Sequence, residues 1–343
     1  MEQVFILINQ ILQSNPETLR RGLQLRTYRV IPLQPLAGVI EWIGNAQPIG
    51  DYLSRAHERR HPRDVSPQEA RNIMKAEFDR TGTNPVSKHQ VYVEQVMTRF
   101  HPVLRHFFAE TTDSTGEWFL KRQRYIRSAA VGSMAGYIVG LGDRHCQNIM
   151  IDHTSGDLIH IDLNMIFEVG KTLRIPERVP FRLTRDIVDG MGHVGLEAGF
   201  TNCAVHTLKV LKGRMEMMLM IMEAFKYDPL YRWAQAPPRI SVDGDNPLAP
   251  AHIALGANAA LPPLNASGTL AGRTIQRFLQ GDDEDEGGGH KEAERALLRV
   301  REKLLGMEEG SVLSEAGQVS FLIQQATNEE LLAQMYPGWQ PWM

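Results

Sequence analysis

The feature that most constrains this chain is the eleven-residue run GDRHCQNIMID at 142–152, followed by IDLN at 161–164. Short apolar runs rich in β-branched residues flank the turn-like stretch DHTSGD, and this pattern predicts a β-hairpin. With the turn centred near Ser155, antiparallel pairing places Asn148 directly opposite Asp162, with Cβ atoms about 5 Å apart. The hairpin would therefore bring a carboxamide and a carboxylate together at its open end.

The order of polar side chains in these segments suits phosphoryl transfer from a metal-bound nucleotide. In the kinase template, an Asp accepts the substrate hydroxyl proton, an Asn five residues later holds magnesium, and a further Asp holds the metal that bridges the phosphates. Asp143, Asn148 and Asp162 fit these three positions. Magnesium prefers oxygen ligands and keeps part of its water, so a carboxamide, a carboxylate and nucleotide phosphates make a suitable shell.

These residues also have plain structural interpretations. An Asp beside Gly is commonly a turn residue, and we assign that role to Asp152 and Asp157. A zinc site is disfavoured because the sequence has no paired Cys-x-x-Cys and already offers oxygen ligands of the magnesium type. Its candidate ligands would be His145, Cys146, His153 and His160.

Length and composition set wider bounds. The 343 residues suffice for two or more domains, and the net charge of -3 gives no basic field, so we expect no direct nucleic-acid binding. The two cysteines, Cys146 and Cys203, lie far apart and indicate a reducing compartment. No apolar run approaches the roughly 20 residues of a membrane span, and the N-terminus has no signal-peptide pattern, so we expect an intracellular chain without a membrane partner.

Hydrophobic periodicity predicts a mostly helical α+β fold. A helix over 2–14 ends at an Asn-Pro pair, and strand-like runs follow at 28–33 and 38–43. A turn-rich connector over 44–50 leads into the helical part. A long helix over 118–138, dense in small residues, delivers the chain to the motif.

The pattern is more varied beyond the motif. The irregular stretch 163–180 is long enough to indicate a functional loop. A helix over 205–225 carries five closely spaced methionines, which we interpret as core packing. Residues 234–274 read as a linker, and helices return at 291–305 and 314–335. The terminal MYPGWQPWM is interpreted as an aromatic cluster that docks onto a surface in cis or in trans.

With these segments in view, the chain resembles the catalytic end of the phosphatidylinositol-3-kinase-related protein kinases, and most closely their ataxia-telangiectasia mutated (ATM) type. The resemblance covers nearly the whole chain apart from 56–90 and 234–310. It implies a bilobal α+β fold of the PI3/PI4-kinase type with an incomplete N-lobe, a mostly helical C-lobe and a helical FATC tail. The matching segments are TYRVIPL, GVIEWI, PIGDYL, GYIVGLGDRHCQNIMID, HIDLNMIFEVGK, VPFRLTRDIVDGMG, YDPLYRW, GQVSFLIQQA and PGWQPWM.

The resemblance also implies a domain organisation. The glycine-rich loop and the phosphate-binding lysine of the family would precede Met1, so we expect the isolated chain to be a poor kinase and a poor ATP binder. The implied parts are a partial N-lobe with the hinge (1–46), a C-lobe (47–235) with catalytic loop 142–152 and activation loop 162–180, a partly disordered linker or regulatory insert (236–310) and the FATC domain (311–343).

Residue by residue, Asp143 matches the catalytic base of the family and His145 its imidazole near the transferring phosphate. Asn148 and Asp162 match the ligands of Mg²⁺ or Mn²⁺. Tyr28 matches the inner wall of the adenine pocket that binds ATP. The hinge lining that pocket is matched by Glu41, Trp42 and Ile43.

One position departs from the ATM pattern. Asn164 stands two residues after Asp162, where ATM-type enzymes have Gly and ATR-type enzymes have Asn. We expect this difference to leave activity intact.

The implied function is a serine/threonine protein kinase that modifies Ser or Thr followed by Gln, in DNA-damage checkpoint signalling and telomere maintenance in the nucleus. The implied partners are such protein substrates and a DNA-break sensor complex of the MRN type that binds regions outside this chain, with a homodimer expected only for the full-length protein. The alternatives are a phosphoinositide lipid kinase, which shares GDRHxxN, and an inactive truncated kinase fragment. A lipid kinase needs a basic activation loop, and this one offers only Lys171, Arg174 and Arg178 beside two glutamates.

Overall fold

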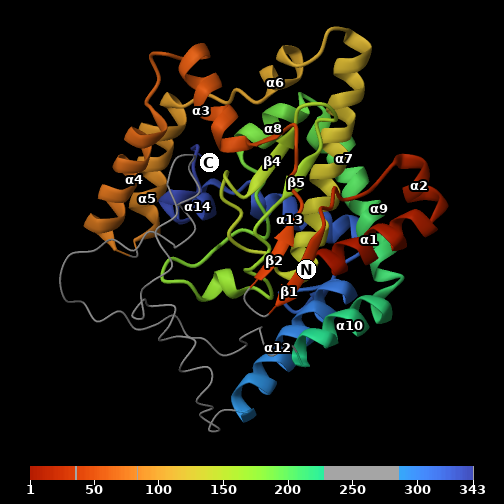
Figure 1. Ribbon diagram of the computed structural model, residues 1–343. Coiled ribbons are helices and arrows are strands. Elements are labelled where there is room, and N and C mark those ends of the chain that lie inside the picture. Colours follow the sequence, from red (N-terminus) through yellow and green to blue (C-terminus); the bar gives the residue numbers. More distant parts are fainter. Residues whose placement is uncertain (35–36, 83, 228–285, 343) are drawn as a thin grey trace, which may run out of the picture. The chain divides into compact units, whose positions relative to one another are not determined.

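Figure 1 shows the computed structural model, which describes residues 1–34, 37–82, 84–227 and 286–342. The predicted linker over 234–274 lies outside these residues. The α-helices are α1 (Glu2–Ser14), α2 (Pro16–Arg21), α3 (Ile49–Arg60), α4 (Pro67–Thr81), α5 (Pro85–Val91), α6 (Arg105–Glu110), α7 (Thr115–Val139), α8 (Arg185–Met191), α9 (Thr201–Lys212), α10 (Met215–Glu223), α12 (Glu286–Leu305), α13 (Glu315–Ala326) and α14 (Glu329–Leu332). Short 3-10 or π turns span Tyr92–Val96, Met97–Arg99, Val169–Thr172, Gly195–Phe200, Ala224–Tyr227 and Pro337–Trp339.

The strands form three small antiparallel sheets among the described residues. The sheets have the orders β1-β2, β3-β4-β5 and β6-β7. Their strands are β1 (Val30–Gln34), β2 (Ala37–Ile40), β3 (Ala46–Pro48), β4 (Ile149–Asp152), β5 (Leu158–His160), β6 (Met307–Glu308) and β7 (Ser311–Val312). The predicted mostly helical α+β fold is confirmed, and none of the described helices is both long and apolar enough to cross a membrane.

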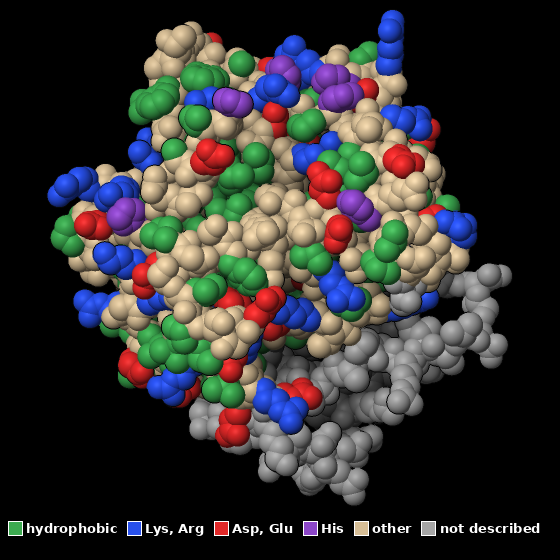
Figure 2. Space-filling model, turned by 180° about the vertical axis from the view of Figure 1, so that it is seen from behind, with side chains coloured by type: hydrophobic (Ala, Val, Ile, Leu, Met, Phe, Trp, Pro, Cys, Tyr) green, Lys and Arg blue, Asp and Glu red, His purple; other side chains and the backbone are tan. Residues whose placement is uncertain are grey.

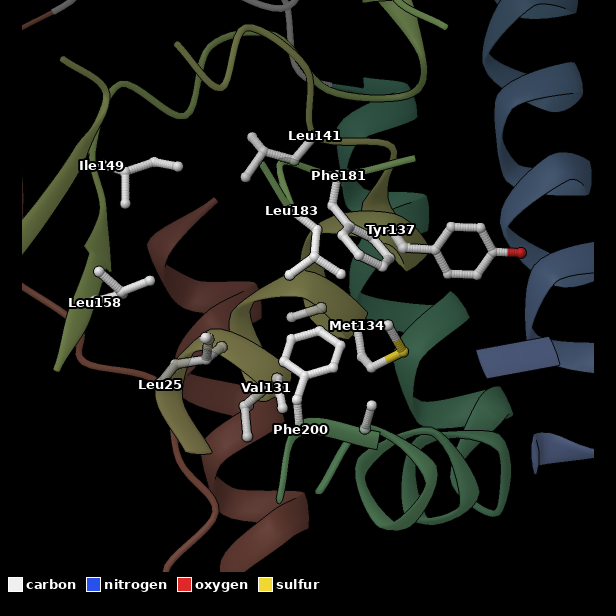
Figure 3. Close-up of a cluster of buried hydrophobic side chains, with 14 of the residues drawn as sticks. Leu25, Val131, Met134, Tyr137, Leu141, Ile149, Leu158, Phe181, Leu183 and Phe200 are labelled. Atoms are coloured by element: carbon white, nitrogen blue, oxygen red, sulfur yellow. The ribbon is translucent and has the colours of Figure 1, made fainter. Parts of the chain in front are cut away.

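The central element is α7, which contacts β5, α6, α8 and α9. Every residue from Ser128 to Val139 is buried, and the small side chains in this run let neighbouring elements approach closely. Figure 3 shows Val131, Met134 and Tyr137 of this helix facing Phe181 and Phe200. The core therefore forms around the helix that leads directly into the motif.

Two predicted segments were wrong. The helix predicted over 205–225 is two helices, because α9 ends at Gly213, a residue that weakens helix propagation. Of its methionines, Met218 and Met222 are buried in the core but Met220 is 73% exposed, so core packing holds only for part of the cluster. The connector predicted over 44–50 contains β3, which adds a third strand to the motif hairpin.

A polar cluster ties the C-terminal elements to α7. Tyr137 donates a hydrogen bond to Glu308 of β6, and Gln318 of α13 donates to Tyr137 Oη at 3.0 Å and to Glu308 at 3.1 Å. Lys303 of α12 donates to the carbonyl of Tyr137 at 2.8 Å and lies 2.7 Å from Glu168 Oε1. Figure 3 shows the hydroxyl of Tyr137 pointing toward these elements. The C-terminal part of α12 is thus anchored to the end of α7 and to Glu168.

The aromatic tail docks in cis. Trp339 and Trp342 are 3% and 1% exposed, and the indole of Trp342 donates to the carbonyl of Pro67 at 2.9 Å. Arg182 donates to the carbonyls of Trp339 and Gln340, and Arg185 reaches that of Trp342. The last residues therefore close over the chain that follows the activation loop.

Candidate active site

The catalytic loop begins where α7 ends. Gly140 adopts the left-handed conformation with φ 66°, and its N–H bonds to carbonyls of the last helical turn. A Cβ at this position would lie 2.5 Å from the backbone nitrogen of Glu168, so the site requires glycine. The helix consequently ends sharply, three residues before Asp143.

Both carboxylates of the candidate site occupy strained backbone. Asp143 has φ 57° and Asp162 has φ 52°, a left-handed conformation that residues other than glycine adopt infrequently. Each such residue costs on the order of 1 kcal/mol or more and persists only where its surroundings hold it. Tertiary contacts, rather than local backbone preference, therefore fix the backbone of Asp143 and Asp162.

Arg144 supplies much of this support. Its side chain is 2% exposed, and burial lowers its pKa to about 10, so the guanidinium stays charged at neutral pH. It donates hydrogen bonds of 2.6 to 3.2 Å to four backbone carbonyls. These carbonyls belong to Gly142, Asn148, Ile161 and Asp162. One buried cation thus joins the loop 142–148 to the segment that carries Asp162.

The hairpin pairs one residue away from the predicted register. Ile149 faces His160, and the N–H of Ile161 donates to the carbonyl of Asn148 at 3.1 Å. Asn148 is therefore opposite Ile161, and the predicted pairing with Asp162 was wrong. Asp162 instead leaves the strand in its left-handed turn while Arg144 holds its carbonyl.

Asn148 binds Asp143 directly. Its Nδ2 donates to the Asp143 carbonyl at 2.9 Å and to Oδ2 of the same residue at 3.3 Å. Because the amide nitrogen serves these two bonds, the carboxamide oxygen is the atom of Asn148 that could bind a metal. The residue can therefore orient Asp143 and offer an oxygen ligand at once.

His145 lies beside the same carboxylate. Its Nε2 is 3.9 Å from Asp143 Oδ2, and its Nδ1 accepts the backbone N–H of Gln147 at 3.1 Å. Burial lowers the pKa of His145, which favours the neutral ring. With Nδ1 as the acceptor, the remaining proton is on Nε2, the nitrogen nearer Asp143.

Asp162 has its own neighbours. Asn164 donates its side-chain N–H to Asp162 Oδ1, so the residue in the position where ATM-type enzymes have glycine binds the carboxylate. Burial and the charge of Glu2, with a smaller contribution from Asp162, raise the pKa of Tyr28 to about 12. The role of Tyr28 in the adenine pocket stays a prediction.

The donor set suits a hard divalent cation. Asp162 offers a carboxylate and Asn148 a carboxamide oxygen, and Arg144 fixes the backbone of both. Oxygen donors of this kind match Mg²⁺ or Mn²⁺ better than softer metals. The residues present therefore fit the metal that the resemblance implies.

The predicted hinge has a different environment. Glu41 pairs with Arg29 through two hydrogen bonds, of 2.8 and 2.9 Å, which extend the β1–β2 ribbon. Trp42 is 90% exposed, and Ile43 is half-buried. The structure does not enclose these side chains in a pocket, so their role in nucleotide binding stays a prediction.

Sequence reasoning missed Glu177, which it counted only as an acidic residue of the activation loop. Glu177 Oε1 accepts the N–H of Asp143 at 2.7 Å, and Trp339 also hydrogen-bonds its carboxylate. A Cβ at Gly142 or Gly170 would lie 2.5 Å or 2.0 Å from Glu177 Oε2. The two glycines make room for this carboxylate, and no sequence pattern signalled the contact.

The chain is similar to known proteins along its whole length. A model of the phosphatidylinositol 3- and 4-kinase family matches residues 1–235. The chain belongs to this family. A FATC domain matches residues 312–343. The family predicted from the motifs is therefore confirmed.

Members of the phosphatidylinositol 3- and 4-kinase family match along the whole chain. Serine-protein kinase ATM of Sus scrofa is 40% identical over 347 residues, covering 100% of this chain and 11% of that protein. Serine/threonine-protein kinase tel1 of Schizosaccharomyces pombe is 41% identical over 341 residues, covering 99% of this chain and 11% of that protein. The solved "Complete CtTel1 dimer with C2 symmetry" has a TM-score of 0.78 at 36% identity, covering 100% of this chain and 11% of that one. The chain thus spans about a tenth of the length of these relatives.

Proposed function

We propose that this chain forms the catalytic region of a serine/threonine protein kinase of the ATM and Tel1 type. It transfers the γ-phosphate of ATP to Ser or Thr side chains that precede Gln. The observation that supports this best is the direct binding of Asp143 by Asn148, at 2.9 and 3.3 Å, beside the Nε2 of His145. The names of the relatives, serine-protein kinase ATM and serine/threonine-protein kinase tel1, also support this proposal. The alternative that an assay must exclude is an inactive kinase fragment.

Asp143 acts as the base that accepts the proton of the substrate hydroxyl. Asn148 and Glu177 hold its carboxylate and its backbone N–H, so the acceptor oxygen keeps one position during the reaction. His145, neutral and protonated on Nε2, donates a hydrogen bond toward negative charge that develops on the transferring group. Its lowered pKa keeps this donor uncharged beside Arg144.

Asn148 and Asp162 would hold Mg²⁺ or Mn²⁺, which would neutralise charge on the nucleotide phosphates. Asn164 keeps the Asp162 carboxylate in one orientation. Tyr28 and the hinge residues Glu41, Trp42 and Ile43 would contact the adenine of ATP.

The activation loop favours protein over lipid substrates. Lys171, one of its three cations, is paired with Glu168 at 3.0 Å. Recognition of inositol phosphates needs several free cations, so this loop offers too little positive charge for a phosphoinositide kinase. An extended peptide containing Gln is the better match.

The full-length protein would act in DNA-damage checkpoint signalling and telomere maintenance in the nucleus. This assignment rests on the relatives named ATM and tel1. A homodimer is proposed because the similar Tel1 structure is a dimer with C2 symmetry. A DNA-break sensor complex of the MRN type would bind outside this chain.

A chimera provides the direct test. This chain replaces the matching segment of Schizosaccharomyces pombe tel1, and the purified protein receives labelled ATP with a Ser-Gln peptide, a matched Ser-Asn peptide or phosphoinositide vesicles. We expect phosphorylation of the Ser-Gln peptide at a rate at least about tenfold above that of the Ser-Asn peptide, because an unpaired buried amide costs a few kcal/mol. Equal rates would remove the Gln preference, vesicle phosphorylation would support the lipid kinase, and no transfer would support an inactive chain.

A further inference from the structure

Three side chains far from the catalytic loop converge in a way that the kinase reaction does not use. The candidate ligand atoms of His61, Asp64 and His101 all lie within 4.8 Å of one another. Asp64 Oδ2 is 2.6 Å from His101 Nδ1, and the rings of His61 and His101 lie together with centroids 5.1 Å apart. Histidine side chains gather near the upper edge of the view in Figure 2.

Backbone hydrogen bonds fix these residues in place. The N–H of Asp64 donates to the carbonyl of His61 at 3.0 Å, which closes a tight turn after α3. The N–H of Val65 donates to the carbonyl of Arg99 at 3.0 Å, so the two segments lie side by side. The N–H of His101 then donates to Asp64 Oδ2 at 3.0 Å. The three side chains are therefore presented by a formed loop rather than by independent flexible segments.

A fourth residue supports the carboxylate from behind. His57 is 2% exposed, stacks on Phe100 with ring centroids 3.8 Å apart, and places Nε2 3.3 Å from Asp64 Oδ2. Buried partners of this kind orient a ligating carboxylate and are typical of the outer shell of metal sites. The arrangement has an inner set of three ligands and a buried neighbour that holds one of them.

We infer that His61, Asp64 and His101 bind a zinc ion, with water in the fourth position. Two imidazoles and one carboxylate suit zinc, whereas magnesium and calcium favour sites made entirely of oxygen. Around one zinc ion the ligand atoms stand about 3.3 Å apart. Because the candidate atoms all lie within 4.8 Å of one another and the closest pair is 2.6 Å apart, side-chain rotations that change these separations by at most about 1.5 Å would give that spacing. The His101 side chain is 53% exposed, which gives the ion a path of entry.

The position suggests what the ion does. Asp64 lies three residues before Pro67, whose carbonyl accepts the indole N–H of Trp342. An ion at this site would join the turn after α3 to the segment before α6, and so hold the loop against which the terminal tryptophan docks. Zinc should therefore stabilise the folded chain, by an amount that rises with zinc concentration.

The test measures bound metal rather than kinase activity, so it stands apart from the proposed function. The purified 343-residue chain is stripped with a chelator, titrated with zinc at micromolar concentration, desalted and analysed for metal content. The variants are His61→Gln and His101→Gln, which change side chains at or near the surface. His193→Gln, at an exposed histidine elsewhere, is the matched control.

We expect about one zinc per chain for the wild type and the control, and background levels for the double variant His61→Gln/His101→Gln. Cobalt should give the visible absorption of a four-coordinate site in the wild type and lose it in each single variant. Equal zinc content in wild type and double variant, or binding only at millimolar zinc, would overturn the inference. Circular dichroism of the single variants separates loss of the site from loss of the fold.

Discussion

Two antiparallel hairpins carry the two halves of the candidate active site, and they differ in what surrounds them. The β4–β5 hairpin packs on α7, with Ile149, Ile151 and Ile159 at most 1% exposed. The β1–β2 ribbon is exposed at every described position, including Leu33 at 64% and Ile40 at 67%. The half proposed to transfer phosphate is therefore positioned by this chain's own core. The half proposed to bind adenine is a ribbon with exposed apolar side chains.

The largest effect should come from the buried half. Asp162→Asn in the tel1 chimera keeps the shape of the side chain but removes the charge that binds metal. We expect the rate of phosphate transfer to fall by a factor of about 10² or more, because electrostatic stabilisation of this kind is worth that much. The measurement is labelled-phosphate transfer to the Ser-Gln peptide, with the thermal unfolding midpoint as the folding control. Turnover like that of the wild type would remove Asp162 from the site.

A smaller loss is expected from the residue that holds Asp143. Glu177→Ala removes the acceptor of the Asp143 N–H and leaves space beside Gly142 and Gly170. We expect kcat to fall about tenfold, because the variant loses one buried hydrogen bond, and we expect KM for ATP to be nearly unchanged. Glu177→Gln retains an acceptor oxygen and should recover most of the rate. If both variants lose activity equally, the loss is not caused by removal of the hydrogen bond from the Asp143 N–H to Glu177.

The buried half should also show a pH dependence of stability. Burial lowers the pKa of His160 to about 3, and its ring packs against α7, where a Cβ at Gly132 would lie 2.9 Å from Nε2. Below about pH 6.5 the His160 ring is protonated in the unfolded chain but stays neutral in the folded chain. The contribution of His160 to the free energy of unfolding is therefore fully present above pH 6.5 and is lost progressively as the pH falls toward 3. His160→Asn should flatten the slope of unfolding free energy against pH between 6.5 and 5 by up to about 1.4 kcal/mol per unit. His193→Gln should keep the slope of the wild type, and an unchanged slope in His160→Asn would contradict the assignment.

The smallest effect on stability is expected in the ribbon. Trp42→Ala removes a side chain that is 90% exposed, so the free energy of unfolding should change by less than about 0.5 kcal/mol. If the hinge binds adenine, the same variant should weaken nucleotide binding by the chimera in a titration with magnesium and ATP. A stability loss above 2 kcal/mol, on the scale typical of buried aromatic residues, would show that Trp42 belongs to the core.

Local sequence patterns were enough to predict the motif hairpin and the helix leading into it, whereas the roles of Asp143, Asn148 and Asp162 stay a prediction. The register was wrong because the turn is shaped by a side chain. Asp152 Oδ1 accepts the N–H groups of Thr154 and Ser155, which moves the centre of the turn by half a residue. The amino-acid composition of the turn does not predict a shift of its centre by half a residue.

The contributions of Arg144 and Glu177 could not be predicted for a different reason. Both are charged residues that patterns assign to the surface. Arg144 is buried because four carbonyls converge on it, and Glu177 reaches Asp143 across 34 positions of sequence. Such roles depend on tertiary contacts that appear only when the loops are folded together.

The most direct test of the contrast between the two hairpins is hydrogen exchange on the chimera, with and without magnesium and ATP. Amides of the catalytic segment, such as those of Asn148 and Ile161, are hydrogen-bonded within the chain. We expect peptides covering 142–162 to exchange at least about tenfold more slowly than peptides covering 30–40 in the absence of nucleotide, because their opening requires loss of core contacts. Nucleotide should then slow exchange mainly in the ribbon. Equally fast exchange in both hairpins without nucleotide would contradict the claim that the core of this chain positions the catalytic half.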